Sequence, residues 1–502
     1  MAPSFYLIEV EAMHEVIAEF DRRLNGRAPD EVIPAVDAQH IADLPLLKAL
    51  LVSPRRTMNK SAAHLFVVGA APTASEVLGR LEGLENSTNS TERHLQRMHA
   101  VAQRLKEDEC WAKGPFLSPA HCWASVLPFA GTANGSVRTQ AHNGHKADGA
   151  WREHGRDRHA TPASHTRITQ VQKPYLLLAT GILLDYMLGN ELQNTITTPG
   201  SRVILASIDP SFANVGVNLR AKARYLLGNA LTIPYWAHHY ARAAVPSQQP
   251  ALLQLQDSGG RAGVLFHGGT RRYDYGVRLR TESSLKHLRR YNTTPVDLRI
   301  GEMTRGEIDQ LNDNWAAYMS SGASFGSASL CMSPSGDTIT SRRTFDALSG
   351  GCVPVLVRSS FLMELNGWDW GTCLPFPSTI DWPRIALRLL AKKGWTCEAG
   401  AARWLDRWHN GMVEREELEA MRRRGMSAFN AHLDYERNPQ GVLSALLREV
   451  LLNRRPIVPT CQLETVYRPT RATAWTCRPR RDEEIDQHLL ASISNIEHGP
   501  LS

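Results

Sequence analysis

The sequence lacks the features that would place it in a familiar class at once. Its eight cysteines include no closely spaced Cys-x-x-Cys pair, so neither a zinc site nor a dithiol redox motif is indicated. No apolar run reaches the roughly 20 residues that a membrane-spanning helix needs. The start of the chain has no basic stretch followed by a long apolar run, as a signal peptide would. No internal repeat is evident, so a solenoid or propeller is not indicated.

The composition is that of an ordinary globular protein. The chain has 502 residues, 42% hydrophobic and 21% charged, which is enough for two or more domains with their own cores. Its formal net charge of +7 favours an anionic partner, such as a phosphate-bearing small molecule, an acidic polysaccharide, nucleic acid or lipid headgroups. No single segment interleaves aromatic and basic residues, so we do not expect a nucleic-acid partner.

Alternating helices and strands are predicted along most of the chain. Buried parallel strands are expected where apolar residues run without alternation, and helices where they recur every three or four residues. The most apolar run, residues 174–188, is interrupted by Asp185 and is predicted to be a core helix. Strands are expected at 62–70, 201–209, 262–269, 328–334 and 353–357, and helices at 6–24, 45–53, 91–111, 276–291, 380–394, 401–412 and 415–433.

This alternation of helices and strands predicts an α/β fold made of two doubly wound domains that face a cleft. We expect an N-terminal domain over 1–195, with a polar insertion at about 132–172 that is rich in His, Gly, Arg and Thr. A second domain is expected over 196–454, and a basic, proline-punctuated tail over 455–502. Ligands of such folds bind at the carboxyl ends of the strands. Cys373 and Cys397 would pair in a lumenal protein, or the cysteines are buried free thiols.

One segment, "SPSGDTITSRRTFDALSGGCVPVLV" at 333–357, combines a turn, a short helix and an apolar strand. Gly336 suits the turn, and Thr340 or Ser341 is expected to cap a helix over about 342–348. The glycines at 350–351 are expected to end this helix and to lead directly into the strand.

Two arginines at the start of this helix oppose its macrodipole, at a cost of about 0.3 to 1 kcal/mol each. A diphosphate bound by the free backbone N–H groups and an arginine fork would offset that cost. Asp346, one turn on, would then accept hydrogen bonds from sugar or ribose hydroxyls. The alternative is that Arg342 or Arg343 simply pairs with Asp346 on one helix face, worth about 0.3 to 0.5 kcal/mol.

The segment resembles the signature of the exostosin-like glycosyltransferases, family 47. In that family a Cys-x-x-Pro-x-Gly turn precedes Ser-x-Arg-x-x-(Asp/Glu)-Ala and then Gly-Cys-(Ile/Val)-Pro-Val. Weaker similarity extends the resemblance, with gaps, from about residue 5 to 395, including "LTIPYW" (231–236), "RAGVLFHGG" (261–269) and "GVRLR". The positions that match the signature itself are Cys331, Pro334, Gly336, Ser341, Arg343, Asp346, Ala347, Gly351, Cys352, Pro354 and Val355.

The resemblance implies a GT-B fold and inverting transfer from a nucleotide sugar, usually a UDP-sugar, to a glycan or polysaccharide acceptor. No cofactor or catalytic metal is expected, and the chain has no Asp-x-Asp motif of the kind that metal-dependent transferases use. Gly336 and Ser341 belong to the expected donor site. Arg343 is expected on the diphosphate, with Arg278 or Arg280 assisting, and Asp346 on donor hydroxyls.

Inversion also needs a general base for the acceptor hydroxyl. The family carries Trp-x-x-x-x-Gly-x-Asp-His in its N-terminal half, and two stretches compete for it here. "WAKGPFLSPAH" would supply His121 but lacks the Asp. "WREHGRDRHATPASH" would supply His159 and His165 at nearly the family spacing, and the choice stays open.

Two further expectations come from the resemblance. Family members are typically Golgi proteins with an N-terminal anchor, so this chain is expected either to start inside the catalytic region or to be a soluble relative, and a complex with another glycosyltransferase is possible. The competing function is a catalytically silent GT-B subunit that binds carbohydrate or a partner, because the N-terminal half departs from the family pattern.

Overall fold

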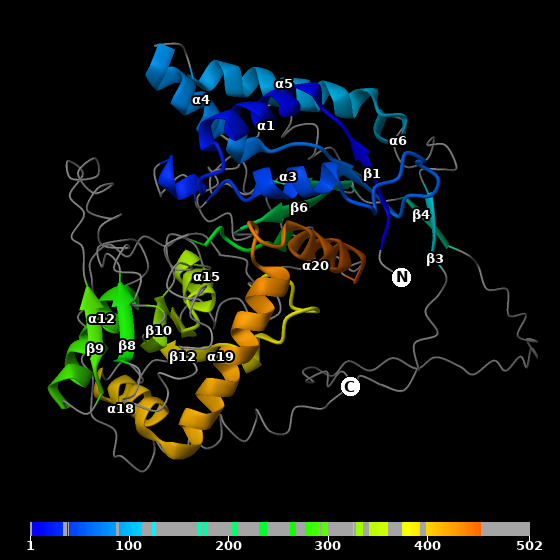
Figure 1. Cartoon of the computed structure of the whole chain (residues 1–502). Coiled ribbons are helices and arrows are strands. Elements are labelled where there is room, and N and C mark those ends of the chain that lie inside the picture. The colour runs from blue at the N-terminus through cyan, green and yellow to red at the C-terminus, as the bar shows by residue number, and fades with distance from the viewer. Residues whose placement is uncertain are drawn as a thin grey trace, which may run out of the picture.

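A computed structural model of the chain shows two parallel β-sheets, each flanked by helices (Figure 1). The structure describes residues 3–33, 38, 40–86, 90–112, 123–126, 169–172, 175–178, 203–208, 230–237, 262–267, 277–291, 294–299, 325, 328–334, 341–359, 374–391 and 398–452. Within these ranges no helix is both long enough and apolar enough to cross a bilayer.

The first sheet has five parallel strands in the order β1-β2-β5-β6-β7. Its three central strands are apolar and lie between neighbours on both sides, which explains why they lack an alternating pattern. The described strands of this sheet follow one another in chain order. They are β1 (Phe5–Ile8), β2 (Leu65–Val68), β5 (Tyr175–Leu178), β6 (Val203–Ser207) and β7 (Ala230–Thr232).

Several helices flank this sheet. Helix α1 buries Met13, Val16, Phe20 and Leu24, which recur every three or four residues along one face, and exposes charged residues on the other. The pairs α1 and α4, α4 and α5, and α3 and α4 pack on each other. The helices are α1 (Glu11–Leu24), η1 (Pro29–Glu31), α3 (Asp43–Leu51), α4 (Pro72–Asn86), α5 (Ser90–Glu107) and α6 (Glu109–Ala112).

The second sheet is also parallel, in the order β12-β11-β10-β8-β9. The chain makes β8 and β9 first and then continues with β10 on the other side of β8, so the winding reverses between β8 and β10. In open α/β sheets, ligands bind at the carboxyl ends of the strands at such a reversal. The strands are β8 (Ala262–His267), β9 (Val296–Arg299), β10 (Ala328–Pro334), β11 (Val353–Ser359) and β12 (Leu387–Ala391).

Helices α12, α15, α18 and α19 pack against the second sheet, and α20 returns to the first domain, where it packs on α3 (Figure 1). On α20, the Gln440 side chain donates a hydrogen bond to the Ala49 carbonyl oxygen (2.8 Å). Just before α20, the Tyr435 hydroxyl donates to the Pro234 carbonyl oxygen (2.9 Å). One hydrophobic core includes residues of both domains. The helices are α12 (Val277–Tyr291), α15 (Arg342–Ser349), η5 (Trp382–Arg384), α18 (Glu398–Asn410), α19 (Met412–His432) and α20 (Pro439–Leu452).

The first sheet continues past the boundary expected at 195/196. Strands β6 and β7 pair within it, so this sheet runs to Thr232, and the second sheet begins at Ala262. Near the expected insertion at 132–172, β4 (Thr169–Gln172) pairs antiparallel with β3 (Trp123–Val126), which brings the two flanks of that segment together. The expected tail, 455–502, lies outside the described residues.

Three helix predictions were wrong in part. Phe5–Ile8, Tyr175–Leu178 and Leu387–Ala391 are strands, although each overlaps a segment predicted as helical. Each of them pairs in parallel with a neighbouring strand, and that pairing decides the conformation of a short apolar run, which periodicity alone cannot. The other predicted strands and helices agree in type with the described elements, whereas α4, α20, β4 and β9 were not predicted.

A buried carboxyl group lies where α3 meets α4. Asp43 is fully buried, and its Oδ2 accepts hydrogen bonds from the N–H groups of Thr73 (2.7 Å) and Ala74 (3.4 Å) in the first turn of α4. Its Oδ1 has no hydrogen-bond partner among the described residues. Burial raises the pKa of Asp43 to about 7, against the opposing effect of these hydrogen bonds.

This shift predicts a pH-dependent stability. Between the unfolded pKa and pH 7, the folded state binds a proton that the unfolded state does not, so the free energy of unfolding falls as the pH rises. For a folded pKa near 7, Asp43 contributes a loss of about 1.4 kcal/mol between pH 6 and pH 8. Urea unfolding of the wild type and of Asp43→Asn at both pH values measures this contribution as the difference between the two proteins. The same pH dependence in both proteins would contradict the assignment.

Candidate functional site

Helix α15 begins at Arg342, and Ser341 before it is extended (φ −138°). The Ser341 side chain makes no capping hydrogen bond, contrary to the expectation, while its carbonyl oxygen accepts the Thr344 N–H (3.0 Å). Thr340, the other expected cap, lies outside the described residues. The helix ends at the double glycine as predicted, with Gly351 in the left-handed region (φ +73°). A Cβ there would lie 2.9 Å from Met426 Sδ, so both conformation and space favour glycine.

The start of α15 lies at the carboxyl edge of the second sheet, because the helix follows β10 and precedes β11. A hydrogen bond of 2.6 Å joins the hydroxyls of Ser333, near the end of β10, and Thr344, in the first turn of α15. This is also the edge where the winding reverses between β8 and β10. Backbone N–H groups at a helix start carry partial positive charge and suit an anion.

Arg343 extends from α15 across to the end of β8. Its Nε donates a hydrogen bond to the His267 carbonyl oxygen (2.7 Å), and its Nη1 donates to Ser341 Oγ (3.3 Å). The guanidinium carbon lies 5.8 Å from the centre of the Phe266 ring, within cation–π range. The guanidinium is therefore anchored at the point where the winding of the sheet reverses.

Arg342 belongs to a different environment. Its side chain is only 12% exposed, and its Nε lies 3.8 Å from Asp346 Oδ2. Burial lowers the pKa of Arg342, while the carboxylates of Asp346 and of Asp30, in the first domain, oppose that shift. The neighbouring Phe345 ring lies 6.1 Å from that of Tyr235, just after β7. The two arginines thus face different domains.

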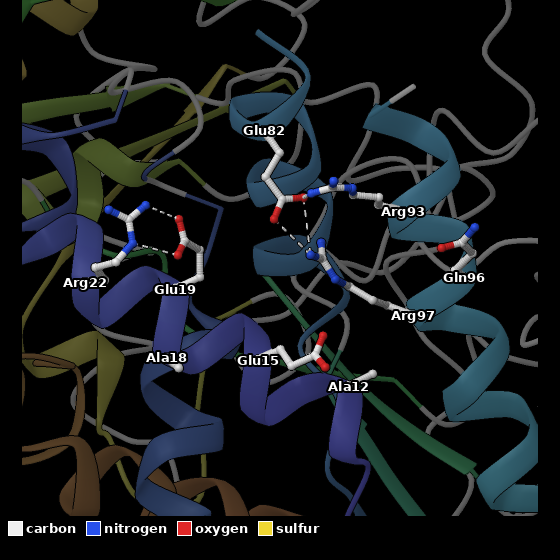
Figure 2. Close-up of a pocket in the computed structure, with 9 residues that line it drawn as sticks. All are labelled: Ala12, Glu15, Ala18, Glu19, Arg22, Glu82, Arg93, Gln96 and Arg97. Carbon is white, nitrogen blue, oxygen red and sulfur yellow. Dashed lines mark hydrogen bonds and ion pairs between the residues drawn. The ribbon is translucent and has the colours of Figure 1, made fainter. Parts of the chain in front are cut away.

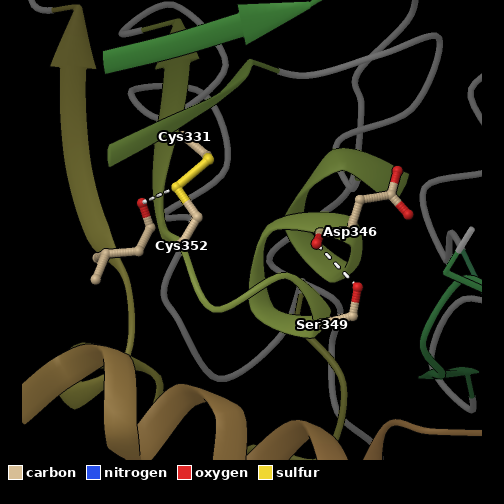
Figure 3. The surroundings of a disulfide bond; sticks show 5 residues. Cys331, Asp346, Ser349 and Cys352 are labelled. Atoms are coloured by element: carbon tan, nitrogen blue, oxygen red, sulfur yellow. Dashed lines mark hydrogen bonds between the residues drawn. A yellow bond between two sulfur atoms is a disulfide. The ribbon is translucent and has the colours of Figure 1, made fainter. Parts of the chain in front are cut away.

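Asp346 is buried (2% exposed) and lies within ion-pair distance of Arg342 four residues earlier. Pairing of an arginine with Asp346 on one helix face was the alternative to a diphosphate site in the sequence analysis. The structure has this pair at Arg342, but it is buried and does not lie on the surface. Ser349 Oγ donates a hydrogen bond to the backbone carbonyl oxygen of Asp346 (2.9 Å), within the same helix (Figure 3).

The sequence reasoning missed a histidine and an aspartate at the same edge. His267 is the last residue of β8, and its Nε2 lies 3.2 Å from Asp297 Oδ2 on β9. The histidine side chain is 5% exposed and the aspartate side chain 33%. For His267 the available signal was its position at the carboxyl end of a predicted strand, where α/β sites form. Asp297 is the second residue of β9, which was not predicted.

The structure describes only some of the remaining expected site residues. Arg278 is buried in the first turn of α12, whose start follows β8. Arg280 lies on the same helix, and its side chain falls outside the described residues, as do Gly336 and the competing histidines His121, His159 and His165. No cluster of three metal-ligating side chains occurs in the part of the chain that the structure describes.

A disulfide bond closes the segment that carries α15. Cys331 on β10 is bonded to Cys352, directly before β11, so the bridge spans 21 residues of sequence and encloses the whole helix (Figure 3). This pairing differs from the one considered between Cys373 and Cys397, which lie outside the described residues. It fixes both ends of the enclosed segment on neighbouring parallel strands.

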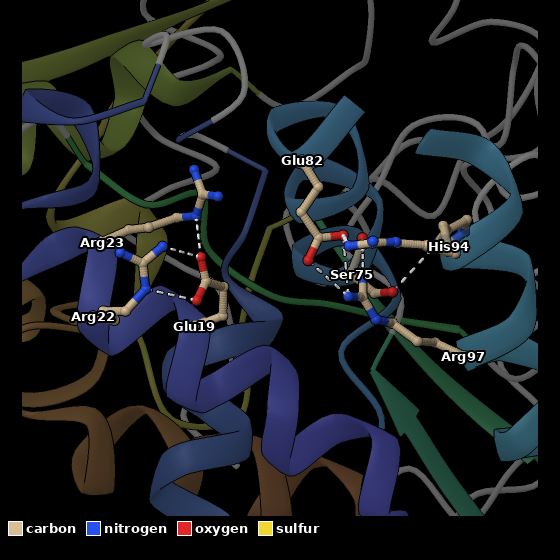
Figure 4. Close-up of polar contacts among 8 residues, drawn as sticks. Glu19, Arg22, Arg23, Ser75, Glu82, His94 and Arg97 are labelled. Atoms are coloured by element: carbon tan, nitrogen blue, oxygen red, sulfur yellow. Dashed lines mark hydrogen bonds and ion pairs between the residues drawn. The ribbon is translucent and has the colours of Figure 1, made fainter. Parts of the chain in front are cut away.

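A separate groove of about 640 Å³ lies between α1 and α5 on the first domain (Figure 2). Glu19 accepts hydrogen bonds from Arg22 and Arg23, and the Arg22 contact lowers the pKa of Glu19 to about 2. Across the groove, Glu82 pairs with Arg97 (3.1 Å), as Figures 2 and 4 show, and with Arg93 (3.4 Å), as Figure 2 shows. Because these arginines are neutralised by glutamates of the same surface, the groove is a weaker candidate for an anion site than α15.

Comparison with known proteins identifies the family of the chain. The chain matches the family model of the Exostosin GT47 domain over residues 134–394, which is just over half of its length and includes β8, β10, α15 and β11. No curated protein matches the chain. The two α/β domains agree with the GT-B type of fold that this family has. The chain therefore belongs to the exostosin GT47 family and is a glycosyltransferase.

Proposed function

We propose that this glycosyltransferase moves a sugar from a UDP-sugar to a glycan or polysaccharide acceptor with inversion at the anomeric carbon. The observation that carries the proposal is the anchored Arg343 at the start of α15, on the carboxyl edge where the sheet winding reverses. An arginine fork and the backbone N–H groups of a helix start are together suited to a diphosphate.

In the proposed reaction, an acceptor hydroxyl oxygen forms a bond to the anomeric carbon while the bond from that carbon to the diphosphate oxygen breaks. A base removes the hydroxyl proton, and the diphosphate leaves with its negative charge held by Arg343 and the start of α15. Arg278 and Arg280 are the further candidates for that charge, and His121, His159 and His165 remain the alternatives for the base.

We assign the donor hydroxyls to Asp346, as the family pattern does. Its carboxylate lies 3.8 Å from Arg342 and is almost fully buried. Donor binding there would therefore replace this contact with hydrogen bonds from the sugar. Gly336 and Ser341 complete the proposed donor site, and no cofactor or metal is assigned to the reaction.

We place the reaction in the Golgi lumen. The Cys331–Cys352 bond favours an oxidising compartment, because disulfides are rare in proteins of the cytosol. Family members typically reside in the Golgi, which agrees with this placement. A complex with another glycosyltransferase is part of the same proposal, and co-purification with a tagged chain would test it.

A thermal-shift screen over a panel of nucleotide sugars tests the function. A donor at about 100 times its Kd should add roughly 2.7 kcal/mol to the free energy of unfolding. We expect a UDP-sugar to stabilise the protein and to be turned over with and without EDTA. Stabilisation without turnover on any acceptor would favour the catalytically silent subunit. No stabilisation by any nucleotide sugar would contradict the proposal.

A further inference from the structure

Two features at the end of β8 meet at a single residue. The His267 ring lies against Asp297 on the neighbouring strand (Nε2 to Oδ2, 3.2 Å), while the His267 backbone carbonyl oxygen accepts the Arg343 Nε–H (2.7 Å). The ring also lies 6.2 Å from that of Phe325. His267 is thus held through its side chain and itself holds the arginine through its backbone.

This arrangement matters because of the chemistry of arginine. A guanidinium binds a phosphate well when its planar fork faces the phosphate oxygens, but the long side chain has many rotamers that do not achieve this. In Arg343, the Nε–H contact, the Nη1 contact to Ser341 and the Phe266 ring together fix the plane. The position of the His267 carbonyl oxygen sets the first of these contacts.

We propose that the His267–Asp297 pair is a positioning device for the donor diphosphate, which fixes the end of β8 so that its carbonyl oxygen orients Arg343. The proposal rests on the proposed function, because it takes a UDP-type diphosphate as the ligand of Arg343. His267 and Asp297 act through Arg343 and are not themselves catalytic residues. Removing the pair leaves the arginine in place but lets its fork turn away.

The test measures the Kd of UDP by isothermal titration calorimetry on the full chain, well below the Tm of each variant. We expect His267→Leu and Asp297→Ala to weaken UDP binding about tenfold, since one oriented charge-assisted contact is worth roughly 1.4 kcal/mol or more. His267→Gln keeps an N–H group for Asp297 and should restore most of the affinity. The KM of the donor should rise with the Kd.

A double variant separates positioning from general destabilisation. Arg343→Lys replaces the planar fork by a point charge, which leaves no fork plane for the His267 carbonyl oxygen to orient. Adding His267→Leu to it should therefore change the UDP affinity no further. A further tenfold loss in that background would overturn the proposal, and so would a His267→Leu protein that binds UDP as tightly as the wild type.

Asp406→Asn provides a matched control at the opposite edge of the same sheet. Asp406 accepts a hydrogen bond from Thr294, just before β9, and another from Asn410. We expect this variant to lower the Tm without changing the UDP affinity, whereas an equal loss of affinity would contradict the positioning role. If the wild type does not bind UDP at all, the proposed function fails. If the wild type binds UDP and Arg343→Lys weakens that binding, an unchanged UDP affinity in His267→Leu refutes only the positioning role of His267 and Asp297.

Discussion

Arg343→Ala is expected to lower the kcat/KM of donor turnover by about 100-fold or more. Removing one preorganised donor from a developing anionic charge typically costs roughly 10²- to 10³-fold in rate. Arg343 is anchored by the His267 carbonyl oxygen and Ser341, so its loss removes an oriented group and not a mobile surface charge. Initial rates with the UDP-sugar identified by the screen measure the effect.

Arg384→Ala is the matched control for this prediction. Arg384 lies in the same domain and is paired with Asp381 in the manner of a surface salt bridge, with both side chains mostly exposed. Such pairs contribute about 0 to 1 kcal/mol, so turnover should not change. Equal turnover in the Arg343→Ala variant and the wild type would exclude the diphosphate role of Arg343.

The second large effect concerns the Cys331–Cys352 bond. Replacing both cysteines by serine is expected to lower the free energy of unfolding by about 3 kcal/mol, because the bond restricts an unfolded segment of about 20 residues. Both cysteines are buried, so the introduced hydroxyls add to the loss. Urea unfolding under non-reducing conditions measures the change.

Reducing agent alone does not isolate this bond, because Cys110 is also disulfide-bonded. Cys331→Ala and Cys352→Ala, each made singly, are the better controls, since each breaks the same bond and should cost about as much as the double change. Free thiols at Cys331 and Cys352 in peptide mass spectra of the unreduced wild type would contradict the assignment, as would a double variant of unchanged stability.

Much of the site's local structure could be predicted from the sequence. The start of α15, its end at the double glycine and the strands on either side follow from turn and helix chemistry within about 25 residues. The family resemblance also rests on this segment. Local signals were sufficient because each contact that ends the helix joins residues only a few positions apart, such as Cys352 N–H to the Ala347 carbonyl oxygen (2.8 Å).

The contacts that orient the site could not be predicted, because they depend on strand order. The Arg343 contact joins residues 76 positions apart, and it forms only because β8 lies next to β10. The disulfide depends on the same kind of placement, since spacing alone does not identify which cysteines pair. The short strands β5 and β12 were predicted as helices because periodicity cannot separate them from buried helices.

From the sequence, only the family pattern distinguished Arg343 from Arg342 at the start of α15. The structure separates them: Arg343 contacts the end of β8, and Arg342 lies beside Asp346 and close enough to the first domain for Asp30 to affect its pKa. That division is a property of the domain interface, where Phe345 and Tyr235 pack. It favours Arg343 for the diphosphate on geometry as well as on resemblance.

The most direct measurement of the central claim compares the affinities of UDP and uridine for the wild type and for Arg343→Ala, by isothermal titration calorimetry in the same buffer. If the start of α15 and Arg343 hold the diphosphate, the wild type should bind UDP at least about tenfold more tightly than uridine, and Arg343→Ala should lose most of that advantage. Equal affinities in the wild type, or an undiminished UDP preference in Arg343→Ala, would contradict it.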